Sequence, residues 1–218
     1  MELWLIRHST TGANLEGRLQ GTLDYPLCSK GRSEAFCLAK RLEGQRFSAF
    51  FCSSQLRARE TAKIIISKNK NIKPLYTPLL REYNWGVAQG LTIKEIAGKY
   101  PDLARNFQRG FQHAKIPGAE GIRNLFKRVK IFFNFLFVLE KNRLCTHPLL
   151  VLSHGRFLHA FLLHFLDMNP QGYWPFSFSP ASITILESDF RLRKRVKLFN
   201  DTCHLRGVQD FDSLDLEK

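Results

Sequence analysis

The sequence lacks the features that mark secreted and membrane proteins. It opens with a strand-like run, Glu2 to Ile6, and shows no basic segment followed by an apolar stretch and a cleavage site, so no signal peptide is expected. The longest apolar run, Ile131 to Leu139, has about half of the roughly 18 residues that a membrane span needs. The five cysteines are odd in number and include no C-x-x-C pair, which fits a disulfide or zinc framework poorly. These absences predict a cytoplasmic protein with reduced thiols and no membrane span.

Acidic residues are scarce relative to basic ones. There are 19 Asp and Glu against 33 Lys and Arg, and the net charge is +14. Such a surplus attracts anions, which leaves phosphorylated metabolites, nucleic acid and acidic membrane surfaces open as partners. The sequence also shows no cluster of carboxylates or histidines at the spacing of metal ligands. We therefore expect neither a metal nor another cofactor.

The chain of 218 residues, 44% of them apolar, can bury one sizeable core. Short apolar runs alternate with amphipathic segments, a pattern typical of an α/β fold with a mainly parallel sheet. The expected strands are Leu3–Ile6, Ala49–Cys52, Lys73–Tyr76, Leu149–Leu152, Ser182–Leu186 and, at an edge of the sheet, Leu192–Leu198. The expected helices begin after Ser29 and after Ser54 and span Asn124–Asn142 and Arg156–Leu166.

Two segments are expected to lie outside this pattern. Residues 78 to 121 contain helix fragments broken by Gly and Pro, which predicts an excursion that caps a site above the sheet. Residues 209 to 218 are acidic and contain few large apolar groups, which predicts a flexible tail. The rest of the chain, with the excursion, is expected to form one domain over residues 1 to 208.

Histidines follow two of the expected strands at the point where each strand ends. The segment Leu5–Asn14 passes from an apolar run directly into Arg7 and His8, and the strand Leu149–Leu152 is followed closely by His154. Open α/β sheets place ligands at the carboxyl ends of their strands, so the two histidines can converge on one site and meet an anion. For the first segment alone, an ordinary strand terminus is the simpler interpretation.

Two arginines lie at the start of the helix expected after Ser54. Arg57 and Arg59 fall near its first turn, and Ser53 and Ser54 are candidate caps. Cations at a helix N-terminus oppose the helix dipole, so helix stability does not explain them, whereas a bound anion does. A solvated basic helix start is an equally good interpretation of this segment.

These segments resemble motifs of the histidine phosphatases, the phosphoglycerate mutase-like superfamily. Arg7 and His8 resemble the R-H-G motif of that family, with Asn14 at the Asn of the T-x-x-N that follows it. Ser53–Ile65 is similar to S-S-x-L-x-R-A-x-x-T-A-x-I-I, which places the second arginine of the family at Arg57.

Further segments extend the resemblance along nearly the whole chain. Gln20–Ala35 is similar to Q-G-x-x-D-x-P-L-[ST]-x-x-G-x-x-Q-A. Leu80–Thr92 is similar to L-x-E-x-x-x-G-x-W-E-G-x-T, which places the acid of the family at Glu82. Pro117–Gly121 resembles the P-G-G-E-S loop, and Ser153–Gly155 the S-H-G motif. The matches occur in chain order, and together they are far more specific than any one of them.

One departure from the family pattern lies beside the expected nucleophile. Ser9 stands where the family has Gly, and Thr10 where it usually has Glu or Gln. Because glycine adopts positive φ without strain, a side chain at residue 9 is expected to strain the turn and lower the rate.

The resemblance implies a metal-free pocket for a phosphoryl group. In it His8 is the nucleophile, and the side chains of Arg7, Arg57 and His154 donate to the phosphoryl oxygens. Glu82 is the general acid; without the resemblance it reads as a surface carboxylate paired with Arg81. Further substrate contacts are expected from four residues, namely Asn14, Gln20, Gly21 and Gly155.

Pattern and resemblance together predict a three-layer α/β/α sandwich with a mainly parallel sheet, an antiparallel edge strand and a helical cap excursion. The predicted activity is metal-independent hydrolysis of a small phosphorylated metabolite through a phosphohistidine. Phosphoglycerate mutase is the second hypothesis, although that branch carries a longer insert than the 71 residues that separate Glu82 from His154 here. A catalytically impaired binder of phosphorylated ligand or nucleic acid is the third, motivated by Ser9 and the net charge.

Two further features bear on partners and substrate. The phenylalanine-rich run Ile131–Leu139 is expected to be a buried helix face, with a homodimer surface as the less favoured alternative. Nucleic acid is not the preferred partner, although the charge leaves it open. Basic residues interleaved with aromatic ones in the excursion are expected to contact the leaving group or to form a solvated surface, namely Lys94, Lys99, Arg105, Arg109 and Lys115.

Overall fold

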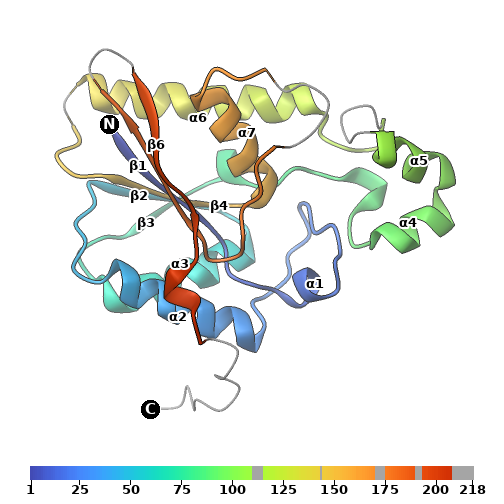
Figure 1. Cartoon of the computed structure of the whole chain (residues 1–218), viewed down its shortest axis with the longest axis horizontal. Coiled ribbons are helices and arrows are strands. Elements are labelled where there is room, and N and C mark those ends of the chain that lie inside the picture. Colours follow the sequence, from blue (N-terminus) through green and yellow to red (C-terminus); the bar gives the residue numbers. More distant parts are fainter. Residues whose placement is uncertain (110–114, 143, 170–174, 190–192, 208–218) are drawn as a thin grey trace.

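The computed structural model describes residues 1–109, 115–142, 144–169, 175–189 and 193–207. Its centre is a six-stranded sheet with the strand order β3-β2-β4-β1-β5-β6 (Figure 1). The strands are β1 (Glu2–Arg7), β2 (Ala49–Ser53), β3 (Pro74–Thr77), β4 (Leu149–Ser153), β5 (Ile183–Ser188) and β6 (Lys194–Asp201). Strands β1 to β4 pair in parallel, whereas β5 is antiparallel to both β1 and β6. The predicted mainly parallel sheet with an antiparallel edge is confirmed.

The edge strand β6 lies further along the chain than predicted. It begins at Lys194 and ends at Asp201, whereas the sequence placed it at Leu192–Leu198; residues 190 to 192 lie outside the described residues. The pairing of β6 with β5 contains register shifts between Ile183 and Leu186. Because a β-bulge inserts an extra residue without ending the ladder, β6 stays paired as far as Asp201.

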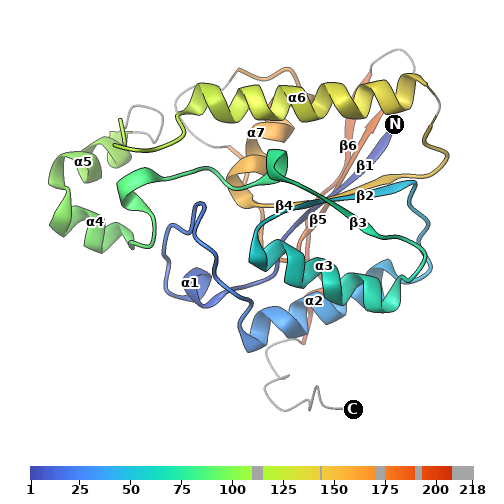
Figure 2. The same ribbon diagram turned by 180° about the vertical axis from the view of Figure 1, so that it is seen from behind.

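Helices cover both faces of the sheet (Figures 1 and 2). The long helices are α2 (Ser29–Leu42) and α3 (Leu56–Lys68) on one face, and α6 (Ile122–Lys141) and α7 (Gly155–Phe165) on the other. The short helices are α1 (Gly12–Leu15), α4 (Ile93–Lys99) and α5 (Pro101–Arg109). Of these, α4 and α5 lie together at one end of the molecule, beyond the sheet (Figure 1). The predicted three-layer sandwich is confirmed.

The two faces of the sheet bury separate cores, because successive side chains of a strand point to opposite sides. On β1, Leu3 and Leu5 enter the core that α6 and α7 cover, while Trp4 and Ile6 enter the core that α2 and α3 cover. Strand β4 is central and is buried at every position. A strand buried on both faces reads as a continuous apolar run, which is why it was visible in the sequence.

The phenylalanine-rich helix α6 is buried along one side and exposed along another. Phe132 and Leu136 are buried in the core. Ile131, Phe135 and Val138 expose between 44% and 53% of their surface, so an apolar stripe remains outside. In the part of the chain that the structure describes, no helix, α6 included, is both long enough and apolar enough to cross a bilayer.

The carboxyl ends of β1, β2 and β4 meet at one edge of the sheet. Parallel pairing aligns Arg7 with Ser153 at the ends of β1 and β4, and the neighbouring strand β2 ends at Ser53. His8 leaves β1 at this point, and its N–H donates to the carbonyl of Ser153 over 3.0 Å. Since α7 begins directly after β4, His154 is brought next to His8.

Candidate active site

His8 is buried at the end of β1 and is held in one tautomer. Its Nδ1 lies 2.7 Å from the carbonyl oxygen of Ser9, which can only accept, so Nδ1 carries the proton. Nε2 then has a lone pair, to which the Nε–H of Arg57 donates over 3.2 Å. Burial above all, and then the charges of Arg57 and Arg7, hold the pKa of His8 well below its usual range. The ring is therefore neutral near pH 7.

Arg57, the second arginine expected in the site, is fully buried. Its Nη1 donates to the carbonyl of Leu23 and its Nη2 to the carbonyl of Gly21, each over 2.8 Å. Burial lowers the pKa of the guanidinium to about 10, against the opposing effect of the Glu82 and Asp24 carboxylates. Arg57 therefore stays charged at neutral pH, and the two carbonyls fix its orientation.

Arg7 and His154 complete the surroundings of His8. The Nη1 of Arg7 donates to the carbonyl of Phe178, and its buried Nε has no hydrogen-bond partner among the described residues. The ring centroid of His154 lies 5.0 Å from that of His8, and its Nε2 pairs with Oγ of Ser53 over 2.7 Å. Burial, followed by nearby arginine charge, holds the pKa of His154 well below its usual range. Both histidines are thus neutral and lie next to fixed cations.

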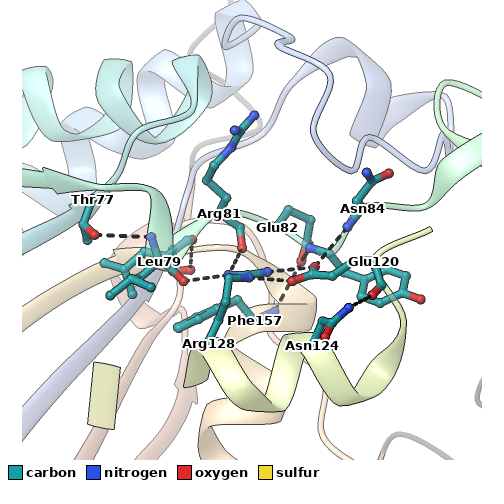
Figure 3. Close-up of polar contacts among 12 residues, drawn as sticks. Thr77, Leu79, Arg81, Glu82, Asn84, Glu120, Asn124, Arg128 and Phe157 are labelled. Carbon is teal, nitrogen blue, oxygen red and sulfur yellow. Dashed lines mark hydrogen bonds and ion pairs between the residues drawn. The ribbon is translucent and has the colours of Figure 1, made fainter. Parts of the chain in front are cut away.

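The carboxylate of Glu82 lies at the N-terminus of α7 (Figure 3). The carboxylate accepts from the N–H groups of Arg156, over 3.2 Å, and of Phe157, over 3.3 Å. It also accepts from the N–H of Tyr83 over 2.8 Å. The first N–H groups of a helix lack partners inside it, so a carboxylate is favoured there. Glu82 binds these backbone groups, where the sequence by itself allowed an ion pair with Arg81.

The loop that carries Glu82 is joined to α6 through the ion pair of Arg128 and Glu120 (Figure 3). Nη1 of Arg128 donates to the carbonyls of Leu79, over 2.6 Å, and of Arg81, over 3.0 Å. Nε and Nη2 of the same arginine contact the carboxylate of Glu120 over 2.6 and 2.9 Å. The N–H of Glu120 donates to the carbonyl of Asn84 over 3.0 Å. The backbone on both sides of Glu82 is therefore held by one pair of side chains.

A cavity of about 230 Å³ opens between these groups. Eight of the nine site residues expected from the sequence line it, namely Arg7, His8, Asn14, Gln20, Gly21, Arg57, Glu82 and Gly155. The ninth, His154, is fully buried beside His8. Segments far apart in the sequence thus supply one site.

Residues 3–202 match the model of the histidine phosphatase superfamily (branch 1). The chain belongs to this superfamily. The family and the phosphatase activity predicted from the motifs are thereby confirmed. Within the described residues of this histidine phosphatase, no group of three or more His, Cys, Asp or Glu side chains is placed to hold a metal ion.

Individual relatives of the histidine phosphatase are similar over most of their length. It is 27% identical to phosphoserine phosphatase 1 of Hydrogenobacter thermophilus over 205 residues, 94% of each chain. It is 28% identical to 2,3-bisphosphoglycerate-dependent phosphoglycerate mutase 2 of Gloeobacter violaceus, over 78% of this chain and 77% of the mutase. The structure of Bacillus stearothermophilus YhfR superposes with a TM-score of 0.80 at 30% identity, covering 94% of this chain and 98% of that one.

The cavity of the histidine phosphatase also contains residues that the sequence did not single out, namely Arg18, Leu19, Trp85, Arg156, Phe176, Ser177 and Phe178. The guanidinium of Arg156 lies over the ring of Trp85, 5.5 Å from its centroid. Arg18 donates to the carbonyl of Gly90 over 2.8 Å and to the carboxylate of Glu95 over 2.7 Å. Arg156 directly follows the S-H-G motif and could have been found by that proximity, whereas Phe176–Phe178 carry no local signal.

The expected substrate-contacting residues also have structural contacts. Oδ1 of Asn14 accepts from the N–H and the hydroxyl of Thr11, while Oε1 of Gln20 is buried without a partner among the described residues. Gly21 has a positive φ of 53°, and a Cβ there would lie 2.1 Å from Oε1 of Gln89. Only glycine therefore fits at position 21 without a shift of that side chain. Gly155 forms the first turn of α7 beside the Arg7 guanidinium.

Two local expectations for this histidine phosphatase were wrong. The backbone at Ser9 does not adopt positive φ, so its side chain does not strain the turn as predicted. The N-cap of α3 is Gln55 rather than Ser53 or Ser54, and it makes no side-chain capping bond. Oγ of Ser53 instead pairs with His154 and accepts from the N–H of Gln55 over 3.3 Å. The Ser53 hydroxyl therefore contacts His154 and does not cap α3, whereas the local sequence pattern predicts a cap.

Proposed function

We propose that this histidine phosphatase hydrolyses a small phosphate monoester through a phosphohistidine formed at Nε2 of His8. The observation that carries the proposal is the hydrogen bond between Nδ1 of His8 and the carbonyl of Ser9. It leaves the lone pair on Nε2, beside Arg57 in the cavity wall. A phosphoryl acceptor with fixed positive charge around it is what this transfer requires.

The reaction takes two displacements at phosphorus. In the first, the lone pair of Nε2 forms a bond to phosphorus while the bond from phosphorus to the ester oxygen breaks. Glu82, in its acid form, gives its proton to that oxygen, and the alcohol leaves. In the second, water attacks phosphorus and passes a proton to the Glu82 carboxylate. The P–N bond breaks, its electron pair returns to Nε2, and inorganic phosphate leaves.

The other charged and donor groups of the site are assigned to the phosphoryl oxygens. The forked N–H groups of Arg7 and Arg57 suit two oxygens at once, which the single ammonium of lysine does not. His154 is assigned to a third contact on the same group. Because these residues already supply positive charge, we expect activity to persist in excess EDTA.

The remainder of the cavity supports a small substrate with a second anionic group. Its volume is about 230 Å³, and Arg18 and Arg156 add positive charge to its wall. The similarity to phosphoserine phosphatase 1 makes O-phosphoserine, which carries a carboxylate, a compound to test first. Asn14, Gln20, Gly21 and Gly155 are assigned to substrate contact through their place in the wall.

Residues 78 to 121 are proposed to form the cap of the site and to select the leaving group. Glu82 and Trp85 in its first part line the cavity, which supports this assignment. None of the five basic residues expected to contact the leaving group is among the described residues that line the cavity. Arg105 instead pairs with the exposed Asp102. The side chain of Arg109 lies outside the described residues. We therefore assign selectivity to Trp85 and Arg156 in place of Arg105 and Arg109.

Mutase activity is the second candidate, favoured by the similarity to the Gloeobacter mutase. A mutase returns the phosphoryl group from the histidine to a hydroxyl of the substrate, whereas a phosphatase passes it to water. Conversion between 2- and 3-phosphoglycerate without release of inorganic phosphate would select the mutase.

Three expectations from the sequence stay predictions. A homodimer finds support in the exposed apolar stripe of α6, which includes Phe135. Nucleic-acid binding rests on the net charge of +14 alone. A cytoplasmic location finds support in five cysteines that are all free thiols in the structure.

The test is a panel of phosphorylated metabolites assayed for release of inorganic phosphate, with EDTA present. The panel holds O-phosphoserine, sugar phosphates, nucleotides and an aryl phosphate. Brief mixing with ³²P-labelled substrate should label His8, and the label should be lost in acid and kept in base, because the P–N bond is acid-labile. His8→Ala should abolish both label and turnover. No turnover across the panel, or a label on Ser9 or Cys28, would contradict the proposal; the former outcome favours the impaired binder.

A further inference from the structure

A buried carboxylate of α2 contacts the peptide group next to the nucleophile. Glu34 is 4% exposed, and its Oε2 accepts from the N–H of Thr10 over 2.9 Å. The N–H of Thr10 and the carbonyl of Ser9 belong to one planar peptide unit and point in opposite directions. That carbonyl is the acceptor for Nδ1 of His8. Two hydrogen bonds through a single peptide group therefore join Glu34 to His8.

The peptide between Glu34 and the nucleophile is held from several sides. The hydroxyl of Thr10 donates to Oε1 of Glu34 over 2.9 Å, and the carbonyl of Thr10 accepts from the N–H of Cys28 over 3.2 Å. Helix α2 approaches this carbonyl closely, since a Cβ at Gly31 would lie 1.8 Å from its oxygen. Glycine at this position is therefore what allows the carboxylate to reach the loop.

The charge of Glu34 needs an explanation beyond holding the loop. In the described part of the chain, both of its oxygens bond Thr10, and the ion pairs do not include it. Burial of a carboxylate without a cation is costly, whereas a neutral Gln could offer Thr10 an oxygen. The family pattern given above has Gln at this position. This chain thus has a charged carboxylate at position 34, where a neutral Gln could also accept a hydrogen bond from Thr10.

Other charges near this chain of hydrogen bonds are mostly positive. On the side of His8 they are Arg7, Arg57 and Glu82. His154, which also lies beside the ring, is neutral. On the side of Glu34, Lys30 and Arg206 line the same shallow cavity, and the Glu34 carboxylate opposes the lowering of the Arg7 pKa by burial. Burial and, after it, the two arginines disfavour positive charge on the His8 ring. Glu34 adds a negative charge at the other end of the peptide that binds the ring.

We propose that Glu34 is a positioning residue which, through the Ser9–Thr10 peptide, keeps the proton of His8 on Nδ1 and stabilises the ring once Nε2 is phosphorylated. A carboxylate that accepts from the N–H polarises the peptide, so the carbonyl becomes a stronger acceptor for Nδ1–H. The lone pair of Nε2 becomes more nucleophilic, and the positive charge that the ring gains with the P–N bond is better tolerated. The second half of this inference rests on the proposed function, whereas the first half concerns the free protein.

The test compares Glu34→Gln with the matched control Glu60→Gln. Glu60 also accepts from a backbone N–H, that of Leu27 over 2.7 Å, but it is not bonded to the peptide beside His8. The ring nitrogens of His8 are observed by ¹⁵N NMR in the free proteins, and kcat and KM are measured on a substrate from the panel. Thermal unfolding checks that each variant folds.

For Glu34→Gln we expect the Nδ1–H signal of His8 to move and the Nε2–H tautomer to become populated, while kcat falls about tenfold and KM changes by less than about twofold. Glu60→Gln should leave the His8 signals and both constants at wild-type values. Unchanged His8 signals in a folded Glu34→Gln protein would overturn the proposal, whatever the activity. The proposed function fails differently, because wild-type protein would then release no phosphate while the NMR comparison still applies.

A second variant guards against an effect of packing alone. Thr10→Ala removes the hydroxyl contact to Glu34 but keeps the peptide N–H, so the tautomer of His8 should be preserved. A change of the His8 signals as large as that of Glu34→Gln would show that the carboxylate acts through loop packing and would overturn the route through the peptide.

Discussion

Arg128 of α6 and Glu120 of the loop before that helix form a two-pronged ion pair, with nitrogen–oxygen distances of 2.6 and 2.9 Å (Figure 3). Arg128 also donates to the carbonyls of Leu79 and Arg81. The pair is mostly buried, so solvent screens the attraction between its charges less than it does in a surface ion pair. It joins the loop that carries Glu82 to the helix layer.

Replacement of Arg128 by Met should therefore allow the loop that carries Glu82 to move, and should lower kcat more than it raises KM. The loss of charged hydrogen bonds should also lower the free energy of unfolding by roughly 1.5–3 kcal/mol. Steady-state kinetics and urea denaturation measure the two effects. Arg193→Met, which breaks the exposed pair with Asp189, is the control and should change neither quantity appreciably. Equal activity in the two variants would contradict a positioning role for Arg128.

Replacement of Glu82 by Gln should separate the two displacements. An alkyl phosphate needs protonation of its leaving group, so its turnover should fall by about 10²–10⁴-fold. A nitrophenyl phosphate has a good leaving group, so it should still phosphorylate His8 and give a burst of one equivalent of nitrophenol, followed by slow hydrolysis. Rapid-mixing absorbance measures the burst. Equal slowing of both substrates without a burst would argue against Glu82 as the acid.

The buried histidines should make the protein sensitive to acid. Burial holds the pKa values of His8 and His154 well below 6.5 and lowers that of His159 to about 4. Below about pH 6.5 the histidines bind protons in the unfolded chain but not in the native protein. Their contribution to the free energy of unfolding is therefore complete above that pH and is lost as the pH falls toward the native pKa values. Each group contributes roughly 1.4 kcal/mol per pH unit in this window.

Urea denaturation at pH 7 and pH 5 tests this pH dependence. The free energy of unfolding should be lower at pH 5, and His159→Gln should reduce the difference between the two pH values. Stability that is the same at both values would contradict native pKa values below the usual range.

Arg156 should determine preference for substrates with a second anionic group. Its guanidinium lies in the cavity wall over the ring of Trp85, 5.5 Å from the ring centroid. Arg156→Met should lower kcat/KM for O-phosphoserine by tenfold or more and change that for an aryl phosphate by less than about threefold. Arg59→Met, which removes an arginine stacked on Tyr76 outside the cavity, is the matched control. Equal loss for both substrates would indicate a general electrostatic effect instead.

The sequence by itself determined the layers of the fold and most of the residues that line the cavity. Strand β4 reads as an apolar run because both of its faces are buried, and α6 reads as a helix because its apolar residues recur with helical period. The motifs around His8, Arg57, Glu82 and His154 are local in the chain, so resemblance could find each of them. The parallel strands β1, β2 and β4 then bring three of these motifs to one edge of the sheet.

Only the tertiary structure decided how those residues are held. The contact of Glu82 with α7, the pair between Arg128 and Glu120, and the path from Glu34 to His8 join segments that no local pattern relates. Hydrogen bonds of this kind depend on which side chains meet after the layers pack, whereas periodicity and motif spacing report only on neighbours along the chain. For that reason the sequence identified residues that line the cavity, but it did not give the orientation of their side chains or the tautomer of His8.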